Sequence, residues 1–200
     1  GLDFKARITG CTVDKVDLDV IGSSSSTTES PMELILCCGM LKDKKMDLVI
    51  KHVTQLGITR WLPFYCDRSI PKHNEKRLAS RIKRWQAIAG ESVKQCRRSR
   101  VPDIVSPLSF PKMLESVQAL DLKIAFWENA TKELADLTGG SHPGSIALLI
   151  GPEGGFTREE ILLAQSKGFE ALSLGPRILR AETAAISGCT LLQHLFGDLQ

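Results

Sequence analysis

The feature that most constrains the fold of this chain is a glycine-rich segment between a buried strand and the start of a helix. Residues 146–150 are five consecutive apolar residues with glycines close on either side, which is typical of a strand buried on both faces. The following Gly-Pro-Glu-Gly-Gly-Phe segment, residues 151–156, fits neither a helix nor a strand. Thr157 and Glu160 then form a capping-box pattern, which predicts a helix start. The loop is either an ordinary connection or a ligand loop, because glycine lets a ligand come close to the backbone.

A second loop of the same kind follows the next predicted strand, residues 168–174. It begins with Gly175 and Pro176 and leads into a helix that we expect over residues 181–196. In open α/β sheets, ligands bind outside the carboxyl ends of the strands, so two such loops predict a ligand site rather than packing alone. The alternation of strands and helices predicts an α/β fold with a mostly parallel sheet flanked by helices.

Together the two segments resemble one family of enzymes. The sequences LIGPEGGF at residues 149–156 and LSLGPRILRAETA at residues 172–184 are similar to the RsmE family. These are the ribosomal RNA uridine N3-methyltransferases of the SPOUT superfamily. The likeness extends from about Glu33 to the C-terminus. It implies a C-terminal deep trefoil knot with the two Gly-Pro loops as its crossings, which helix and strand patterns would not predict because threaded chains are nearly absent from proteins.

The resemblance implies S-adenosyl-L-methionine as the cofactor, bound by the backbone of both loops and by apolar side chains on either side of the adenine ring. Glu128 ends a predicted strand at the same edge and is carried over to this site, although Trp127 stands where the family has a histidine. The expected cofactor-binding residues are Glu128, Leu149, Ile150, Gly151, Gly154, Gly155, Leu172, Leu174, Gly175, Ile178 and Leu179.

The expected reaction is methyl transfer to N3 of a uridine in small-subunit ribosomal RNA. Such a displacement needs neither a protein nucleophile nor a metal, so catalysis rests on positioning and charge. Uracil N3 must lose its proton, and Arg177 or Arg180 is the expected cation that stabilises the resulting anion. The base is Glu182, Glu153 or water, and Glu182 is equally well explained by a structural ion pair with an arginine.

A basic helix predicts contact with RNA. We expect this helix over residues 75–98, and between Lys76 and Arg100 nine lysines and arginines stand against one acid, Glu91. A solvated helix face is the usual meaning of a charge run, but the whole chain carries only +3, so the positive charge is concentrated here. Concentrated positive charge favours contact with phosphates. The expected RNA-binding residues are Lys94, Arg97, Arg98 and Arg100, together with Arg68, which the resemblance implies because CDRS at residues 66–69 is similar to a Ser-Glu-Arg-Ser turn of the family.

Two other functions compete with the enzyme. A non-catalytic RNA-binding or ribosome-assembly protein would use the basic segment 75–100 but would leave both Gly-Pro loops without a role. A phosphate-binding enzyme would use the helix start at Thr157 as an anion site. It would lack the Gly-Lys-Ser/Thr of a P-loop, and Glu153 would repel the phosphate.

The first residues predict a separate small unit. Residues 1–22 read as two strands, which the resemblance identifies as the remnant of an N-terminal PUA-like β-barrel that binds RNA. The serine-rich residues 23–31 are expected to be a flexible linker, and residues 32–200 the SPOUT methyltransferase domain. We expect a cytoplasmic protein. Because the sequence does not begin with methionine, a chloroplast or mitochondrial protein is expected instead if the chain is eukaryotic and a targeting segment is missing.

Composition limits the remaining partners. No apolar run approaches the roughly 18 residues of a membrane span, and the six cysteines and four histidines lack metal-site spacing, so we expect neither a membrane nor a metal. The expected partners are ribosomal RNA or the small-subunit ribosomal particle. The resemblance also implies a homodimer, and the small residues of the last helix would allow another helix to pack closely.

Overall fold

The computed structural model of the chain describes residues 1–42, 44–70, 75–137 and 142–199, without the side chains of residues 75–77. The helices and strands are β1 (Leu2–Cys11), β2 (Val16–Ser25), β3 (Glu33–Gly39), α1 (Lys45–Gln55), β4 (Arg60–Tyr65), α2 (Glu75–Cys96), β5 (Asp103–Ile104), β6 (Leu108–Ser109), α3 (Phe110–Ser116), β7 (Leu122–Phe126), the 3-10 helix η1 (Leu134–Leu137), β8 (Ser145–Ile150), α4 (Arg158–Ser166), β9 (Glu170–Leu172) and α5 (Ala181–Phe196).

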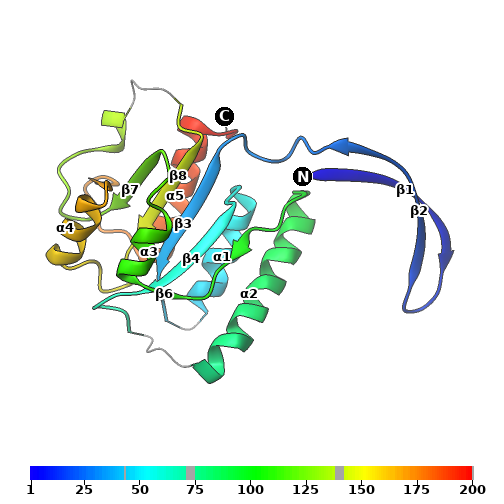
Figure 1. Cartoon of the computed structure of the whole chain (residues 1–200), viewed down its shortest axis with the longest axis horizontal. Helices are drawn as coiled ribbons and strands as arrows, with labels where there is room; N and C mark the ends of the chain where they lie inside the picture. The colour runs from blue at the N-terminus through cyan, green and yellow to red at the C-terminus, as the bar shows by residue number, and fades with distance from the viewer. Residues whose placement is uncertain (43, 71–74, 138–141, 200) are drawn as a thin grey trace.

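A seven-stranded parallel sheet forms the centre of the molecule (Figure 1). The strand order is β5-β4-β3-β8-β7-β9, with β6 beside β4. The central strands β3 and β8 are buried almost throughout, as expected of strands covered on both faces. The predicted α/β class with a mostly parallel sheet is confirmed, and the trefoil knot stays a prediction.

Helices cover both faces of the sheet because successive side chains of each strand point to opposite sides. On β3, Leu34 and Leu36 pack in a core that includes α1, α2 and α5. Ile35 and Cys37 pack in a second core, formed with α3 and α4. Within the described residues, the sheet thus carries α1, α2 and α5 on one face and α3 and α4 on the other.

The direction of α2 matters for the function. The helix begins after β4 has ended, and the chain beyond it enters β5, where Asp103 pairs with Arg60 at the start of β4. The N-terminal end of α2 therefore lies at the edge where the strands end, and its C-terminal end lies at the opposite edge (Figure 1). Trp85 holds the helix on the sheet, since its ring meets that of Trp61 edge-on at 5.0 Å.

Three helices end in the same kind of turn. After α1 and α4, Gly57 and Gly168 adopt positive φ angles of 82° and 84°, and the next amide donates to a carbonyl five residues back. This is the Schellman arrangement that favours glycine. After α2 the same position holds Arg97, with φ of 61°, and Arg98 N donates to Val93 O at 3.1 Å.

The small residues of α5 serve its own sheet. A Cβ atom on Gly188 would lie 2.7 Å from a ring carbon of Phe126 and 2.9 Å from Leu148. Ala185 and Cys189 are completely buried in the same core. These residues therefore let α5 lie close to β7 and β8, and their size is no argument for a partner helix.

The N-terminal strands form an antiparallel ribbon that extends away from the sheet (Figure 1). The two predicted strands are confirmed, although β2 continues through Ser25 into the predicted linker. Large apolar side chains of the ribbon face solvent, with Phe4 63%, Ile8 67% and Val20 63% exposed. The origin of the ribbon as a barrel remnant stays a prediction.

The end of the predicted linker is fixed to the sheet domain. Glu29 forms an ion pair with Arg98 at 2.7 Å and accepts the backbone amides of Ser99 and Arg100 at 2.9 and 3.0 Å. These contacts join residue 29 to the turn that follows α2. The expectation of a plain flexible linker over residues 23–31 therefore fails at its C-terminal end, where the carboxylate meets a partner 69 residues away.

Candidate functional site

The loop after β8 is held in one shape by its own hydrogen bonds. Gly155 N donates to Pro152 O at 2.9 Å, and Gly155 has a φ of 67°, a region that strains residues with a Cβ. The predicted capping box follows. Glu160 N donates to Thr157 Oγ1 at 3.2 Å, and Thr157 N donates to the carboxylate of Glu160 at 2.9 Å. The chain therefore turns from strand to helix within a rigid glycine loop.

Arg68 supports this loop from outside. Its Nη1 donates to Gly154 O at 3.0 Å and to Phe156 O at 3.3 Å. A Cβ on Gly154 would lie 2.9 Å from the Cβ of Arg68, so the glycine permits the approach. We predicted Arg68 as an RNA contact, and that role stays a prediction. What the guanidinium does here is fix two carbonyls of the loop.

The second loop is closed by Ser173. Gly175 N donates to Ser173 Oγ at 3.1 Å, and Ser173 N donates to Lys132 O at 2.8 Å. Gly175 has a φ of 101° and open space beside its Cα. The loop ends at Arg180, whose carbonyl accepts the amide of Ala184 at 2.8 Å and so begins α5.

The two loops and the end of β7 enclose a cavity of about 450 Å³ at the carboxyl edge of the sheet. This size is in the range of small-molecule sites, and the place is the one expected for ligands in open α/β sheets. Most of the predicted cofactor and catalytic residues line it: Glu128, Ile150, Gly151, Gly154, Gly155, Leu174, Gly175, Arg177, Ile178, Leu179 and Arg180.

Three predicted residues do not line the cavity. Leu149 and Leu172 are completely buried in the two cores, because their side chains point to a face of the sheet instead of along its edge. The expectation that the side chain of Leu149 flanks the adenine ring is therefore wrong, whereas a contact of the cofactor with the backbone of Leu172 stays a prediction. Glu182 also lies outside the lining, and it pairs with Lys45 rather than with an arginine.

Several lining residues escaped the sequence reasoning. Phe126 lies opposite Ile150 in the parallel register, so a correct strand pairing would have placed it at the cavity. Phe156 closes the first loop with a nearly buried ring that stacks over Phe64 at 6.3 Å. Lys45 reaches the cavity from α1, more than 100 residues earlier in the chain, and no local signal marks it.

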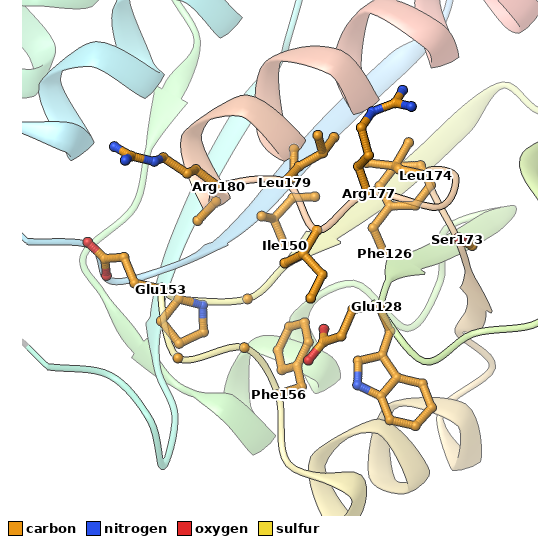
Figure 2. A pocket seen from close by; sticks show the side chains of 18 of the residues that line it. Phe126, Glu128, Ile150, Glu153, Phe156, Ser173, Leu174, Arg177, Leu179 and Arg180 are labelled. Carbon is orange, nitrogen blue, oxygen red and sulfur yellow. The ribbon is translucent and has the colours of Figure 1, made fainter.

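The apolar and acidic parts of the cavity face each other. Figure 2 shows Ile150, Leu179 and Leu174 above, with Phe156 and the carboxylate of Glu128 below. Gly155 makes room for this carboxylate, since a Cβ there would lie 3.0 Å from Glu128 Oε1. A ligand with an apolar ring and a positive charge matches these walls.

Lys45 organises a charged cluster at one end of the cavity. Its Nζ lies 3.4 Å from Glu153 and 3.3 Å from Glu182. Burial raises the pKa of Glu153. The hydrogen bond from the Lys42 amide at 3.0 Å and the charge of the Lys45 ammonium together lower this pKa by more than burial raises it, so the pKa of Glu153 lies below its ordinary value. Glu153 is therefore ionised at neutral pH and is a weak proton acceptor.

The two arginines of the second loop differ in direction. Arg180 extends on the same side of the cavity as Glu153, whereas the guanidinium of Arg177 points away from Glu128 and Phe156 (Figure 2). Both arginines are exposed. Arg180 thus shares the charged end of the cavity with Lys45 and Glu153.

Two polar atoms of lining residues are buried and have no hydrogen-bond partner within the described part of the chain. They are the indole Nε1 of Trp127 and Oε2 of Glu153. Buried polar atoms in native proteins almost always find a partner. A polar ligand in the cavity would supply one, although Thr54, Trp61 and Glu182 carry such atoms outside the lining as well, so the two atoms support a binding site only together with the cavity.

The other predicted RNA contacts lie at the far edge of the sheet, at the C-terminal end of α2. Lys94 pairs with Glu91 at 2.8 Å, and Arg97 and Arg100 are exposed. The side chains of Lys76 and Arg77, at the other end of this helix, lie outside the described residues. RNA binding by Lys94, Arg97 and Arg100 stays a prediction, and it would occur away from the cavity.

Arg98 is a structural residue. It is 7% exposed, and its Nη1 donates to Thr54 O at 2.6 Å and to Ile58 O at 3.1 Å. Together with the Glu29 ion pair, these bonds satisfy the carbonyls where α1 ends. The prediction that Arg98 contacts RNA is wrong, because its charge is already used inside the protein.

Within the described residues, no three histidine, cysteine, aspartate or glutamate side chains are placed to hold a metal ion. A search of the same residues for a helix that is both long and apolar enough to cross a membrane finds none.

Comparison with known proteins places the chain in a family. Residues 28–193 match the family described as RNA methyltransferase domain. The chain is 30% identical to ribosomal RNA small subunit methyltransferase E of Buchnera aphidicola subsp. Acyrthosiphon pisum, over 98% of this chain and 77% of that protein.

Two solved structures superpose closely. One is ribosomal RNA small subunit methyltransferase E from Neisseria gonorrhoeae bound to S-adenosyl methionine. It has a TM-score of 0.91 and 30% identity over 100% of this chain and 81% of the other. The second is a methyltransferase from Legionella pneumophila in complex with the same cofactor. It has a TM-score of 0.90 and 31% identity over 99% of this chain and 81% of the other.

Proposed function

The chain belongs to the RNA methyltransferase family, in the group of ribosomal RNA small subunit methyltransferase E, and from this premise we propose that it methylates RNA of the small ribosomal subunit with S-adenosyl-L-methionine. The observation that carries the proposal is the cavity between the two glycine loops, since two relatives of this fold hold this cofactor. The target atom that we propose is N3 of a uridine.

The lining residues fit S-adenosyl-L-methionine. Ile150 and Leu179 offer apolar walls to an adenine ring, and the carboxylate of Glu128 matches a ligand that carries positive charge. The indole Nε1 of Trp127, which has no hydrogen-bond partner within the described residues, belongs to a residue that lines the cavity. When bound, the cofactor supplies a methyl group that its sulfonium already activates.

The residues at the charged end have distinct roles in the proposed reaction. Arg180 stabilises the negative charge that uracil gains when N3 loses its proton, because it is exposed on the side where Glu153 and Lys45 lie. Arg177 points away and contributes less. Glu182 holds Lys45 in place and is a positioning residue, which leaves its proposed role as the base unsupported.

We also propose that the protein works as a homodimer and meets the small-subunit ribosomal particle in the cytoplasm or in an organelle. The support for a dimer is Ile178 at the mouth of the cavity, which is 85% exposed, and Leu191 on the outer side of α5, which is 37% exposed. A partner that covers Ile178 would help to close the cavity. Light scattering during gel filtration tests the dimer, and a monomer at every concentration would refute it.

Calorimetric titration of S-adenosyl-L-methionine into the purified protein, with ATP as control ligand, tests the proposed function. Saturable binding of the first ligand alone is expected. Transfer of labelled methyl groups to small-subunit ribosomal particles and to their protein-free RNA then tests the reaction, and a nucleoside digest of the product identifies the methylated atom. A folded protein that binds neither ligand would contradict the proposal.

A further inference from the structure

A second concave surface lies beside the cavity, between α1 and α2. This groove, of about 780 Å³, is lined by Lys44, Lys45 and Leu48 of the α1 side and by Arg81 and Arg84 of α2. Asp47 also lines it, and its carboxylate is held by Arg84 at 2.7 Å. Leu48 is 43% exposed, so the groove has an apolar part between its cations.

The charge of the groove is strongly one-sided. Four cationic side chains line it against the single carboxylate of Asp47. Lys45 and Arg84 are engaged by carboxylates, whereas Lys44 and Arg81 have none within ion-pair distance in the described part of the chain. Within the described residues, Lys44 and Arg81 are thus the cations of the groove that a bound anion would meet without displacing a carboxylate. Cations that flank an apolar surface suit a nucleic-acid strand, which carries phosphates and stacking bases.

The groove and the cavity share one residue. Lys45 lines both, and on the cavity side it contacts Glu153 and Glu182. Arg81 and Arg84 belong to the N-terminal half of α2, which lies at the edge where the strands end (Figure 1). The groove therefore leads to the end of the cavity where Arg180 and Glu153 lie (Figure 2).

Resting on the proposed function, we propose that this groove binds the phosphodiester backbone of the RNA strand that carries the target uridine. Lys44 and Arg81 contact phosphates next to the target, and Lys45 marks the point where the strand passes from the groove into the cavity. The target base then arrives at the Arg180 end. The cations at the C-terminal end of α2 lie at the opposite edge of the sheet and are not on this path.

The test uses the full chain with Lys44→Gln, Arg81→Gln and the double variant. Lys112→Gln is the matched control, because it removes one exposed positive charge from α3 on the other face of the sheet. Arg84 is left intact because its loss would also free Asp47. Fluorescence anisotropy measures the binding of a labelled oligouridylate over a range of salt concentrations, and calorimetry measures S-adenosyl-L-methionine.

Each groove substitution is expected to weaken RNA binding and to lower the slope of log affinity against log salt by about 0.7, the value for one phosphate contact on a single strand. The KM for small-subunit RNA should rise with kcat nearly constant, and cofactor affinity should not change. Lys112→Gln should bind RNA like the parent chain.

The proposal would be overturned if both groove variants kept the parental affinity and salt slope, above all if Lys94→Gln and Arg100→Gln lost them instead. The anisotropy does not depend on catalysis. A parent chain that binds no cofactor would refute the proposed function, and the salt slopes would still decide whether RNA lies in the groove.

Discussion

At the scale of single residues, Gly155 meets two constraints that leave no room for a side chain. Its φ is 67°, and a Cβ would lie 3.0 Å from the carboxylate that faces the cavity, that of Glu128. We expect Gly155→Ala to cost about 1–2 kcal/mol of backbone strain and to displace Glu128. Calorimetry should then show a loss of cofactor affinity of about tenfold or more.

The matched control for this change is Gly144→Ala, at the other end of β8. Gly144 has no positive φ, and its added Cβ would meet only Asp121 at the ordinary distance of 3.4 Å. Cofactor affinity should stay near the parental value. Equal binding by both alanine variants would show that the loop tolerates a side chain and that Glu128 is free to move.

Arg180 is the residue on which the proposed chemistry depends most. Removing one preorganised donor to a developing oxyanion typically lowers kcat by about 10²–10³. We expect an effect of this size for Arg180→Ala in methyl transfer, with cofactor affinity retained in calorimetry. Arg177→Ala should have a smaller effect because its guanidinium points away (Figure 2). Unchanged turnover of the Arg180 variant would refute this role.

At the scale of secondary structure, the end of α2 stores backbone strain. Arg97 has the left-handed conformation that glycine occupies after α1 and α4, and among the described residues it is the one non-glycine with positive φ. We expect Arg97→Gly to raise the free energy of unfolding by about 1 kcal/mol, measured by urea titration. Arg97→Ala removes the same charge but keeps the Cβ, so it should give no gain. A gain of equal size with alanine would point to charge repulsion instead of strain.

The connector before β3 is held by a buried ion pair whose strength depends on pH. Burial raises the pKa of Glu29. The hydrogen bond and the charge of Arg98 lower it, and so do the hydrogen bonds from the amides of Ser99 and Arg100, so the pKa of Glu29 lies below its ordinary value of 4.5. The pair is therefore fully stabilising above about pH 4.5, and its contribution disappears as the pH falls through the lower pKa of the folded state.

Glu29→Gln tests this dependence. At neutral pH it should lower the free energy of unfolding by about 1–3 kcal/mol, because the Glu29 side chain is 16% exposed and the glutamine amide oxygen can still accept a hydrogen bond from Arg98. The difference from the parent chain should shrink as the pH falls below about 4.5. A difference that is constant from neutral to acid pH would show that packing of residue 29, and not its charge, fixes the connector.

Features that depend on neighbouring residues could be predicted from the sequence. The capping box of Thr157 and Glu160, the two glycine loops and the helix expected over residues 75–98 all depend on short spacings. Long-range pairing was not accessible in this way. The side chain of Leu149 was misplaced because the face to which it points depends on how β8 pairs with its neighbours, and Arg98 was misplaced because its carboxylate partner comes 69 residues earlier.

At the scale of the whole molecule, the concave surfaces that bind ligands in the proposed function lie at one edge of the sheet, and the contacts of the N-terminal segment lie at the other. The cavity and the groove lie where the strands end, and the ribbon and the Glu29–Arg98 pair lie where they begin (Figure 1). The sheet core lies between these edges and includes no residue of the ribbon. The ribbon therefore adds little to the stability of the cavity, since its apolar side chains remain exposed.

Two shortened chains make this division measurable. A chain that begins at residue 27 loses both ribbon strands but keeps Glu29, and we expect its melting temperature and cofactor affinity to stay near those of the full chain. A chain that begins at residue 32 also loses Glu29 and leaves the charge of Arg98 buried without a partner. Removing the partner of a buried charge costs about 3–5 kcal/mol of stability, and each kcal/mol shifts the melting temperature of a chain of this size by about 2–4 °C. The melting temperature of this chain should therefore fall by roughly 10 °C. If the longer of the two melted as low as the shorter one, the ribbon itself would be part of the folding unit, and the domain would begin at β1 rather than at the residues just before β3.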